Sequence, residues 1–475
     1  MPSSDNRWRG PLRGLLALLV VAIASPAVAA AGVELTRDSL LAGLVREALA
    51  NRPEVAQAQA AAKAEAERVP QARALPDPVL SLSLQNDGFE RLMIGEMETS
   101  YWTVAGAQTF PWPGKRGLRG RAQSLGAEQA EADLERARLT ARADVERAYV
   151  DLLLARDRLA ILARLETVWA QAEGLSRSRY ETGEGAQSDI LRAQLERSRL
   201  RQQRWALIAE ERRSLAELDR ASGRPANAPL ATTLSLGDLD DPLLPDSAAA
   251  EADAEARSPE LRRARLGLEQ SRALVTLARR DYFPDLTLSG GVMPRGGAFE
   301  PMWQAGVSLP LPLWAAGKQS RAVRESRLRE QVAESGAEAV RRTLRQRLEE
   351  RRGALTALLE TNRLYRAGLL VQSEATVSST MAQYRVGRVP FASVLEALEG
   401  WLGDLAGYYE SVATTQRVDI ARRELSLEPI AGPAAGGLGG GPMPGAGGLS
   451  GAPASAGGAS PAPAAASGAS AMPRM

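Results

Sequence analysis

Short segments of the chain alternate between apolar and small polar residues. The clearest runs from Leu80 to Gln85, where Leu82 and Leu84 are separated by serines. A period of two residues is typical of a β-strand with two unlike faces. The same alternation, less clean in the first case, recurs in three other segments: 101–110, 286–289 and 304–309. The pattern therefore predicts four strands, arranged as two pairs. Alternation alone does not decide whether the apolar face meets a protein core or lipid.

Longer segments have a helical period instead. Residues from about 116 to 180 contain no proline, and one helix of that length would reach on the order of 100 Å. Apolar residues there recur at coiled-coil-like spacings of three, four and seven, and charged residues cover the other faces. The positions that carry this spacing are Val145, Tyr149, Leu152, Leu159 and Leu162, and later Leu344, Leu348, Leu355 and Leu359. An ordinary coiled coil would explain these helices, but not the strand pairs inserted between them.

The two halves of the chain share ordered landmarks at an offset close to 200 residues. Each half is predicted to contain a helix of roughly 25 residues, two strands, and two long helical runs separated by a Gly-containing break. The matched landmarks are Arg52-Pro53-Glu54 with Ser258-Pro259-Glu260, Pro76-Asp77 with Pro284-Asp285, Phe110-Pro111-Trp112-Pro113-Gly114-Lys115 with Leu309-Pro310-Leu311-Pro312 and Gly317-Lys318, and Tyr180-Glu181-Thr182-Gly183 with Tyr384-Arg385-Val386-Gly387. We therefore predict a mainly α chain with a β portion, built from a duplicated helix–strand–strand–helix–helix unit.

The N-terminus has the form of a secretory signal peptide. Arg7, Arg9 and Arg13 precede the apolar stretch Leu15–Ile23, and small-residue cleavage boxes follow at 27–31. The apolar stretch is too short for a membrane-spanning helix. The expected organisation is a signal peptide at 1–31, a first repeat at 32–222, a Pro-containing linker at 223–256, a second repeat at 257–428 and a disordered tail rich in Gly, Ala and Pro at 429–475. Three methionines in that tail, Met443, Met472 and Met475, are interpreted as incidental rather than as metal ligands.

Composition argues against an enzyme and against a nucleic-acid partner. The 475 residues contain no histidine and no cysteine, which removes the commonest general base, the thiolate nucleophile and the usual zinc ligands. The 59 basic and 57 acidic residues are interleaved along the helices, so no basic patch stands out. The carboxylates lie at charge-pairing spacings, and we assign no catalytic residue, no cofactor and no resident metal.

Four strands cannot close a barrel with a usable lumen, and an open sheet edge cannot face lipid. If the strands lie in a membrane, several copies of the chain must share one barrel. Three copies would give twelve strands, which is within the range of outer-membrane barrels. The same copies would bring their long helices together beneath the barrel.

The duplicated unit resembles the TolC family of outer-membrane efflux proteins over roughly residues 34–428. The most specific marks are Tyr180-x-x-Gly183 followed by Asp189-Ile190-Leu191, and Tyr384-x-x-Gly387 followed by Ser393-Val394-Leu395. The run Phe110-Pro111-Trp112-Pro113-Gly114-Lys115-Arg116 is similar to the CzcC- and CusC-like heavy-metal branch. A Pro-Gly turn where a strand meets a helix also has a purely structural reason.

The resemblance implies a homotrimer with a twelve-stranded barrel in the outer membrane and a helical tunnel across the periplasm of a Gram-negative bacterium. It also implies a periplasmic adaptor and an inner-membrane pump of the resistance–nodulation–division type as partners. The residues that would meet the adaptor at the tips of the tunnel are Tyr180, Gly183, Asp189, Tyr384 and Gly387. Family members often place acidic residues just beyond the second turn, at the closed aperture. This sequence has Ser393 where aspartate is common, so the aperture candidates are Ser393, Glu396 and Asp189.

These features favour a passive export duct, with heavy-metal cations as its cargo. A duct for drugs or small organic molecules is the alternative, because selectivity would reside largely in the pump. A periplasmic coiled-coil adaptor or scaffold would share the signal peptide and the helices, but would have no use for two strand pairs. An envelope enzyme is the remaining class, and the absence of histidine excludes a Ser–His–Asp triad.

Overall fold

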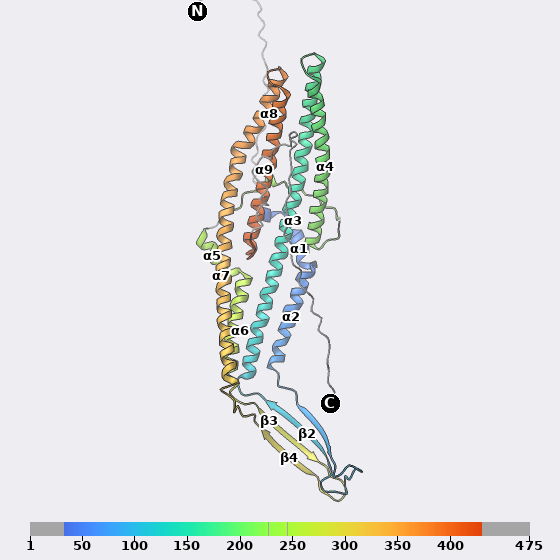
Figure 1. Ribbon diagram of the computed structural model, residues 1–475, viewed down its shortest axis with the longest axis vertical. Helices are drawn as coiled ribbons and strands as arrows, with labels where there is room; N and C mark the ends of the chain where they lie inside the picture. The colour runs from blue at the N-terminus through green and yellow to red at the C-terminus, as the bar shows by residue number, and fades with distance from the viewer. Residues whose placement is uncertain (1–32, 227, 245, 430–475) are drawn as a thin grey trace, which may run out of the picture. The chain divides into compact units, whose positions relative to one another are not determined.

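A computed structural model describes residues 33–226, 228–244 and 246–429. The expected signal peptide and nearly all of the tail lie outside these residues, so both remain predictions. The first repeat consists of α1 (Ser39–Asn51), α2 (Pro53–Arg73), β1 (Val79–Gln85), β2 (Tyr101–Phe110), α3 (Lys115–Glu181) and α4 (Gln187–Ser222). The second consists of α5 (Ser247–Arg257), α6 (Pro259–Arg280), β3 (Leu286–Met293), β4 (Met302–Ser308), α7 (Gln319–Leu364), the π-helical η3 (Tyr365–Leu369), α8 (Leu370–Arg385) and α9 (Phe391–Glu424). The prediction of a mainly α, duplicated chain is confirmed (Figure 1).

Proline separates two helices at the start of each repeat. Pro53 and Pro259 are the first residues of α2 and α6, where their missing N–H is not needed. The preceding helices α1 and α5 therefore end, and a new helix begins at an angle set by the extended residue before each proline. Because α5 is the counterpart of α1, the second repeat begins inside the stretch 223–256 that the sequence suggested was a linker.

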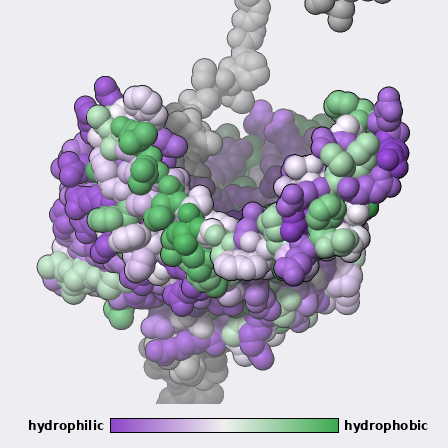
Figure 2. Space-filling model, turned by 90° about the horizontal axis from the view of Figure 1, so that it is seen from below, coloured by the Kyte–Doolittle hydropathy of each residue, from purple (hydrophilic) through white to green (hydrophobic). Residues whose placement is uncertain are grey.

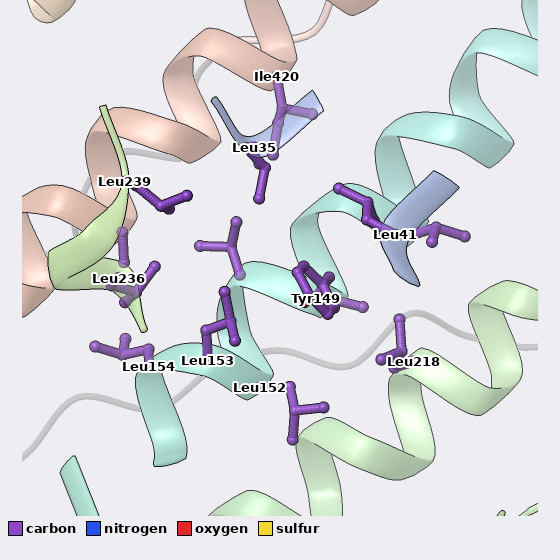
Figure 3. Close-up of a cluster of buried hydrophobic side chains, with 14 of the residues drawn as sticks. Leu35, Leu41, Tyr149, Leu152, Leu153, Leu154, Leu218, Leu236, Leu239 and Ile420 are labelled. Carbon is purple, nitrogen blue, oxygen red and sulfur yellow. The ribbon is translucent and has the colours of Figure 1, made fainter. Parts of the chain in front are cut away.

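The remaining part of that stretch is also packed. It contains the single 3₁₀ turn η2 (Leu236–Asp238), and Leu236 and Leu239 are buried. Both leucines join the largest hydrophobic cluster, in which Leu35 and Leu41 from the start of the described chain meet Tyr149 and its neighbours on α3 (Figure 3). Four prolines made the stretch look loosely organised, but its leucines anchor it across α3 and α9.

The apolar residues that recur at coiled-coil-like spacings in the long helices are mostly buried. Val145, Tyr149 and Leu152 are inaccessible to solvent, and Leu344 and Leu355 are equally buried in the second repeat. Helix α3 packs against α2, α4, α6 and α9, and α7 packs against α6 and α9. In Figure 1 the strands lie at one end of the long helices and the α3–α4 and α8–α9 turns at the other. No helix of the described residues is both long and apolar enough to cross a membrane.

All four predicted strands form one antiparallel sheet in the order β1-β2-β3-β4. The central pairing of β2 with β3 joins the two repeats, with Val104 opposite Val292 and Phe110 opposite Leu286. Residues directly opposite each other point to the same face, so the register fixes two unlike faces. One face carries Leu80, Leu82, Leu84, Trp102, Val104, Phe110, Leu288, Val292, Trp303 and Val307.

Each of these ten side chains exposes more than a third of its surface. Serines, threonines, glutamines, alanines and glycines dominate the opposite face, together with methionines at one end of β3 and β4. Seen from the strand end, hydrophobic residues gather in patches among hydrophilic ones (Figure 2). Within the described residues, the apolar face is not part of a core, and it has the character of a lipid-facing surface.

Candidate functional site

The two turns at the tips of the long helices share one backbone geometry. Gly183 and Gly387 adopt left-handed φ angles of 76° and 74°. Each glycine N–H donates to the carbonyl of the tyrosine three residues earlier, at 3.0 Å in both turns. The following N–H groups, of Glu184 and Arg388, donate five residues back. This hydrogen-bond pattern closes a helix C-terminus and favours glycine at the left-handed position.

The tyrosines of the two turns nevertheless differ in environment. Tyr180 exposes 47% of its surface, whereas Tyr384 exposes 1%. The Tyr384 hydroxyl donates to the Asp189 carboxylate, 3.2 Å away at the start of α4, and lies 3.1 Å from the Ser176 hydroxyl of α3. Burial raises the pKa of Tyr384, and the nearby Asp189 charge acts in the same direction. The second turn is thus fastened to the first hairpin, whereas among the described residues no hydrogen bond of the Tyr180 hydroxyl fastens the first turn in the same way.

Arg179 completes the connection between the turns, and the sequence did not single it out. Its Nη1 donates to the Tyr384 carbonyl at 2.7 Å, and its Nη2 donates to the Glu184 carbonyl at 3.1 Å. The guanidinium also lies over the Tyr384 ring, 4.8 Å from the ring centroid. One cation therefore bridges the last turn of α8 and the α3–α4 turn, with a favourable cation–π geometry.

An apolar cluster below the turns packs the two hairpins together. Trp169 of α3 meets Phe391 of α9 edge-on at 6.4 Å between ring centroids, and Phe391 also contacts the Tyr384 ring at 5.4 Å. The other buried members of the cluster are Leu162, Leu165, Ala172, Ala193, Leu200, Val394, Leu398 and Trp401. Because the cluster draws on four helices, the positions of both turns depend on its packing.

A charged pair stabilises the first hairpin close to the turn. Glu173 of α3 is 8% exposed, pairs with Arg197 of α4 and accepts a hydrogen bond of 3.2 Å from Gln194. The hydrogen bond from Arg197 is the main reason that the pKa of Glu173 lies below its ordinary value. The carboxylate therefore ties α3 to α4 within the buried part of the hairpin.

The predicted site residues separate into two groups. Asp189 and Tyr384 are brought together, and Gly387 lies against Arg179, since a Cβ at Gly387 would approach Arg179 Nη2 to 3.0 Å. Ser393 and Glu396 lie in the first two turns of α9, and no described contact joins either to Asp189. Glu396 is exposed and has no ion-pair partner among the described residues. Their aperture role remains a prediction.

The described residues offer no cluster of three or more acidic side chains close enough to hold a metal ion. The charged side chains of the helices form ion pairs instead. A metal passing through a channel would be cargo rather than a resident cofactor.

Comparison with known proteins places the chain in a family. The family model for outer membrane efflux proteins matches residues 44–224 and 252–423, which together are more than half of the chain. The chain belongs to the outer membrane efflux protein family. This membership confirms the resemblance: proteins of this family are outer-membrane channels that extend into the periplasm, and they are not enzymes.

Three relatives illustrate the similarity. Nodulation protein T of Rhizobium leguminosarum bv. trifolii is 28% identical over 263 residues, covering 52% of this chain and 55% of that protein. The cobalt-zinc-cadmium resistance protein CzcC of Cupriavidus metallidurans is 24% identical over 361 residues, or 73% of this chain and 82% of CzcC. The solved structure of CusC matches with a TM-score of 0.69 at 17% identity, covering 82% of this chain and 92% of CusC. The chain thus spans only about half the length of the nodulation protein, and the CusC likeness bears on the fold alone.

Proposed function

We propose that this chain is the outer-membrane duct of a tripartite export system and that it works as a homotrimer. The observation that carries the proposal is the open four-stranded sheet with one exposed apolar face. The sheet is joined to long helices, whose two hairpins are connected at their tips by the hydrogen bond from Tyr384 to Asp189. An apolar outer face suits lipid, and a face of small polar residues suits a water-filled lumen. Transport energy would come from the partner pump.

The sheet edges supply the reason for a trimer. Strands β1 and β4 each have one neighbour in the described chain, which leaves a row of backbone donors and acceptors on either edge. Such groups cannot remain unpaired in hydrocarbon. Pairing β4 of one copy with β1 of the next removes both edges, and three copies would give a closed barrel of twelve strands.

The turns are the proposed docking site for a periplasmic adaptor, which would connect the duct to an inner-membrane pump of the resistance–nodulation–division type. Tyr180, Gly183 and Gly387 lie at the surface of the tips and are open to a partner. The contacts of Tyr384 with Asp189 and Arg179 would hold the resting state. Adaptor binding would then open the duct by exchanging these contacts for new ones.

Metal cations are the proposed cargo, on the likeness to CzcC, whose name describes cobalt, zinc and cadmium resistance. Small organic molecules are the alternative cargo. A deletion strain should be screened for sensitivity to copper, cobalt, zinc, cadmium and a panel of drugs. Sensitivity to metals alone supports the metal assignment, and sensitivity to drugs alone overturns it.

Deletion of the segment 384–390 tests the tip assignment. Export should be abolished, while a heat-sensitive trimer should still be extracted with outer membranes. Arg342→Met is the control, because Arg342 lies in the middle of α7, away from the tips, and pairs with Glu338 of the same helix. Normal export in the deletion strain would refute the docking role. Recovery of the full-length protein in the soluble periplasm would instead favour an adaptor or scaffold.

A further inference from the structure

A buried lysine fastens the two repeats together where the strands meet the helices. Lys115, the first residue of α3, is 4% exposed. Its ammonium group lies 2.9 Å from the Asp285 carboxylate and donates to the Phe283 carbonyl at 2.8 Å. The same carboxylate accepts the Trp112 N–H at 2.9 Å. The Pro-Gly-Lys motif of the first repeat is therefore completed by the Pro-Asp step of the second.

The chain contains a second copy of this pair, and its members are not joined to each other. Lys318 directly precedes α7 just as Lys115 begins α3, and Asp77 precedes β1 as Asp285 precedes β3. Both Lys318 and Asp77 are exposed, and neither has an ion-pair partner among the described residues. Lys115 thus pairs with acidic residues of the other repeat, with Asp285 and, at 3.4 Å, with Asp281. The matching Lys318 and Asp77 have no such partner within the part of the chain that the structure describes.

We propose that Lys318 of one copy pairs with Asp77 of the neighbouring copy. The inference rests on the proposed trimer and adds to it a specific contact between protomers. Within one chain, the end of β2 meets the start of β3. In a closed ring, the end of β4 would meet the start of β1 of the next copy, which brings Lys318 to Asp77 in the arrangement that Lys115 and Asp285 already have.

The apolar surroundings of the two pairs support the same arrangement. Next to Lys115, Trp112 stacks on Phe283 with ring centroids 5.1 Å apart. The repeat alignment equates Trp112 with Leu311 and Phe283 with Leu75, which are 69% and 40% exposed. These two leucines would pack on each other beside the new ion pair. The four extra residues 313–316 of the second repeat lie before Lys318, so they do not separate it from α7.

The same alignment gives the strand register between copies. Within the chain, Gln108 lies opposite Leu288 and Val104 opposite Val292. Replacing each residue by its repeat counterpart places Val307 opposite Leu80 of the next copy, and Trp303 opposite Leu84. All four of these residues belong to the apolar face, so the register continues that face from one protomer to the next.

Cysteine cross-linking tests the pairing cleanly, because the chain has no native cysteine. A salt-bridged lysine and aspartate are too far apart at Cβ for a disulfide, so a bifunctional thiol reagent of about 8 Å span is needed. The full-length variant Asp77→Cys/Lys318→Cys in outer membranes should give a covalent trimer. When a chain with only Asp77→Cys is expressed together with a chain that has only Lys318→Cys, the reagent should give covalent dimers and no covalent trimer.

Two further variants serve as controls. Lys115→Cys/Asp285→Cys should react within one chain and give no ladder of oligomers. Gln85→Cys/Lys318→Cys should not react, because Gln85 lies at the far end of β1, roughly 26 Å along the strand from Asp77. For the register, oxidation of Leu80→Cys/Val307→Cys should give disulfide-linked copies. Leu84→Cys/Val307→Cys should give none, since its cysteines are offset by about 13 Å.

Charge reversal provides a measurement that does not depend on reagent geometry. Asp77→Lys and Lys318→Asp should each lower the temperature at which trimers dissociate in mild detergent, and the double variant should restore it. Two results would overturn the pairing and leave the duct function intact. One is a trimer of normal stability that does not cross-link between positions 77 and 318. The other is a trimer whose dissociation temperature is the same with and without the charge reversals. A chain that forms no trimer at all would overturn both.

Discussion

The hydroxyl of Tyr384, at the end of α8, donates to the carboxylate of Asp189, at the start of α4, across 3.2 Å. This hydrogen bond joins residues 195 positions apart in the chain and connects the two helical hairpins at their tips. Because Tyr384 is almost fully buried and Tyr180 is half exposed, the repeat is asymmetric where the duct is proposed to open. The two halves therefore provide internal controls for each other.

Tyr384→Phe should loosen the tip without unfolding the protein. It removes the hydroxyl that reaches Asp189 and Ser176, at a cost of about 1 kcal/mol for each lost hydrogen bond. Single-channel conductance in planar bilayers should rise, or brief openings should become more frequent. Tyr180→Phe should leave conductance unchanged, because no described hydrogen bond uses that hydroxyl. Equal behaviour of the two variants would argue against a lock at Tyr384.

Gly387→Ala should disturb the tip more than Gly183→Ala. Both substitutions force a side chain into a left-handed conformation, at about 1 kcal/mol. Only at Gly387 would the new Cβ also press on Arg179, whereas nothing lies within 4 Å at Gly183. Both variants should therefore lose similar stability in thermal unfolding, but Gly387→Ala alone should alter conductance. A matching change in Gly183→Ala would assign the effect to the turn itself.

The first hairpin should lose stability in acid through Glu173. Its pKa is lower in the folded chain than in the unfolded chain, where a glutamate titrates at about 4.3. The ionised carboxylate therefore stabilises the fold above that pH, and the contribution is lost as the pH falls through the lower, folded-state pKa. Glu173→Gln should remove this acid dependence and cost about 2 kcal/mol at neutral pH. Hydrogen exchange of α3 and α4 amides between pH 3 and pH 6 would measure both effects.

Arg351→Met should release the chain segment that follows α9. Arg351 is 1% exposed, and its Nη2 donates to the carbonyls of Ser426 and Glu428 at 2.6 and 3.0 Å. Burial lowers the pKa of Arg351 to about 10, so the residue is still charged at neutral pH. A glutamate-specific protease should cleave after Glu428 about tenfold faster in the variant, which corresponds to roughly 1.4 kcal/mol of local opening. Arg342→Met is the control, because Arg342 is exposed and pairs only within its own helix.

The sequence by itself determined the local elements of this protein. Strict alternation located β1, and weaker alternation located the other strands, because side chains of a strand point to opposite faces wherever the strand lies. Proline-free runs and apolar spacing located the long helices for a similar reason. Gly183 and Gly387 were recognisable because a left-handed turn restricts the residue type at that one position. Because the unit is duplicated, each of these patterns occurs twice in the chain.

Only the tertiary structure decided which distant residues meet. Alternation along a strand does not show whether the apolar face is covered by other residues. In the structure, the pairing of β2 with β3 aligns the apolar residues of all four strands on one face, and that face is exposed. Arg179 was one of 59 basic residues, and its role depends on a contact with a turn 205 residues away. Asp189 and Ser393 occupy equivalent repeat positions, yet within the described residues only Asp189 accepts a hydrogen bond from a buried tyrosine. Such contacts depend on packing between separate helices, which no local pattern records.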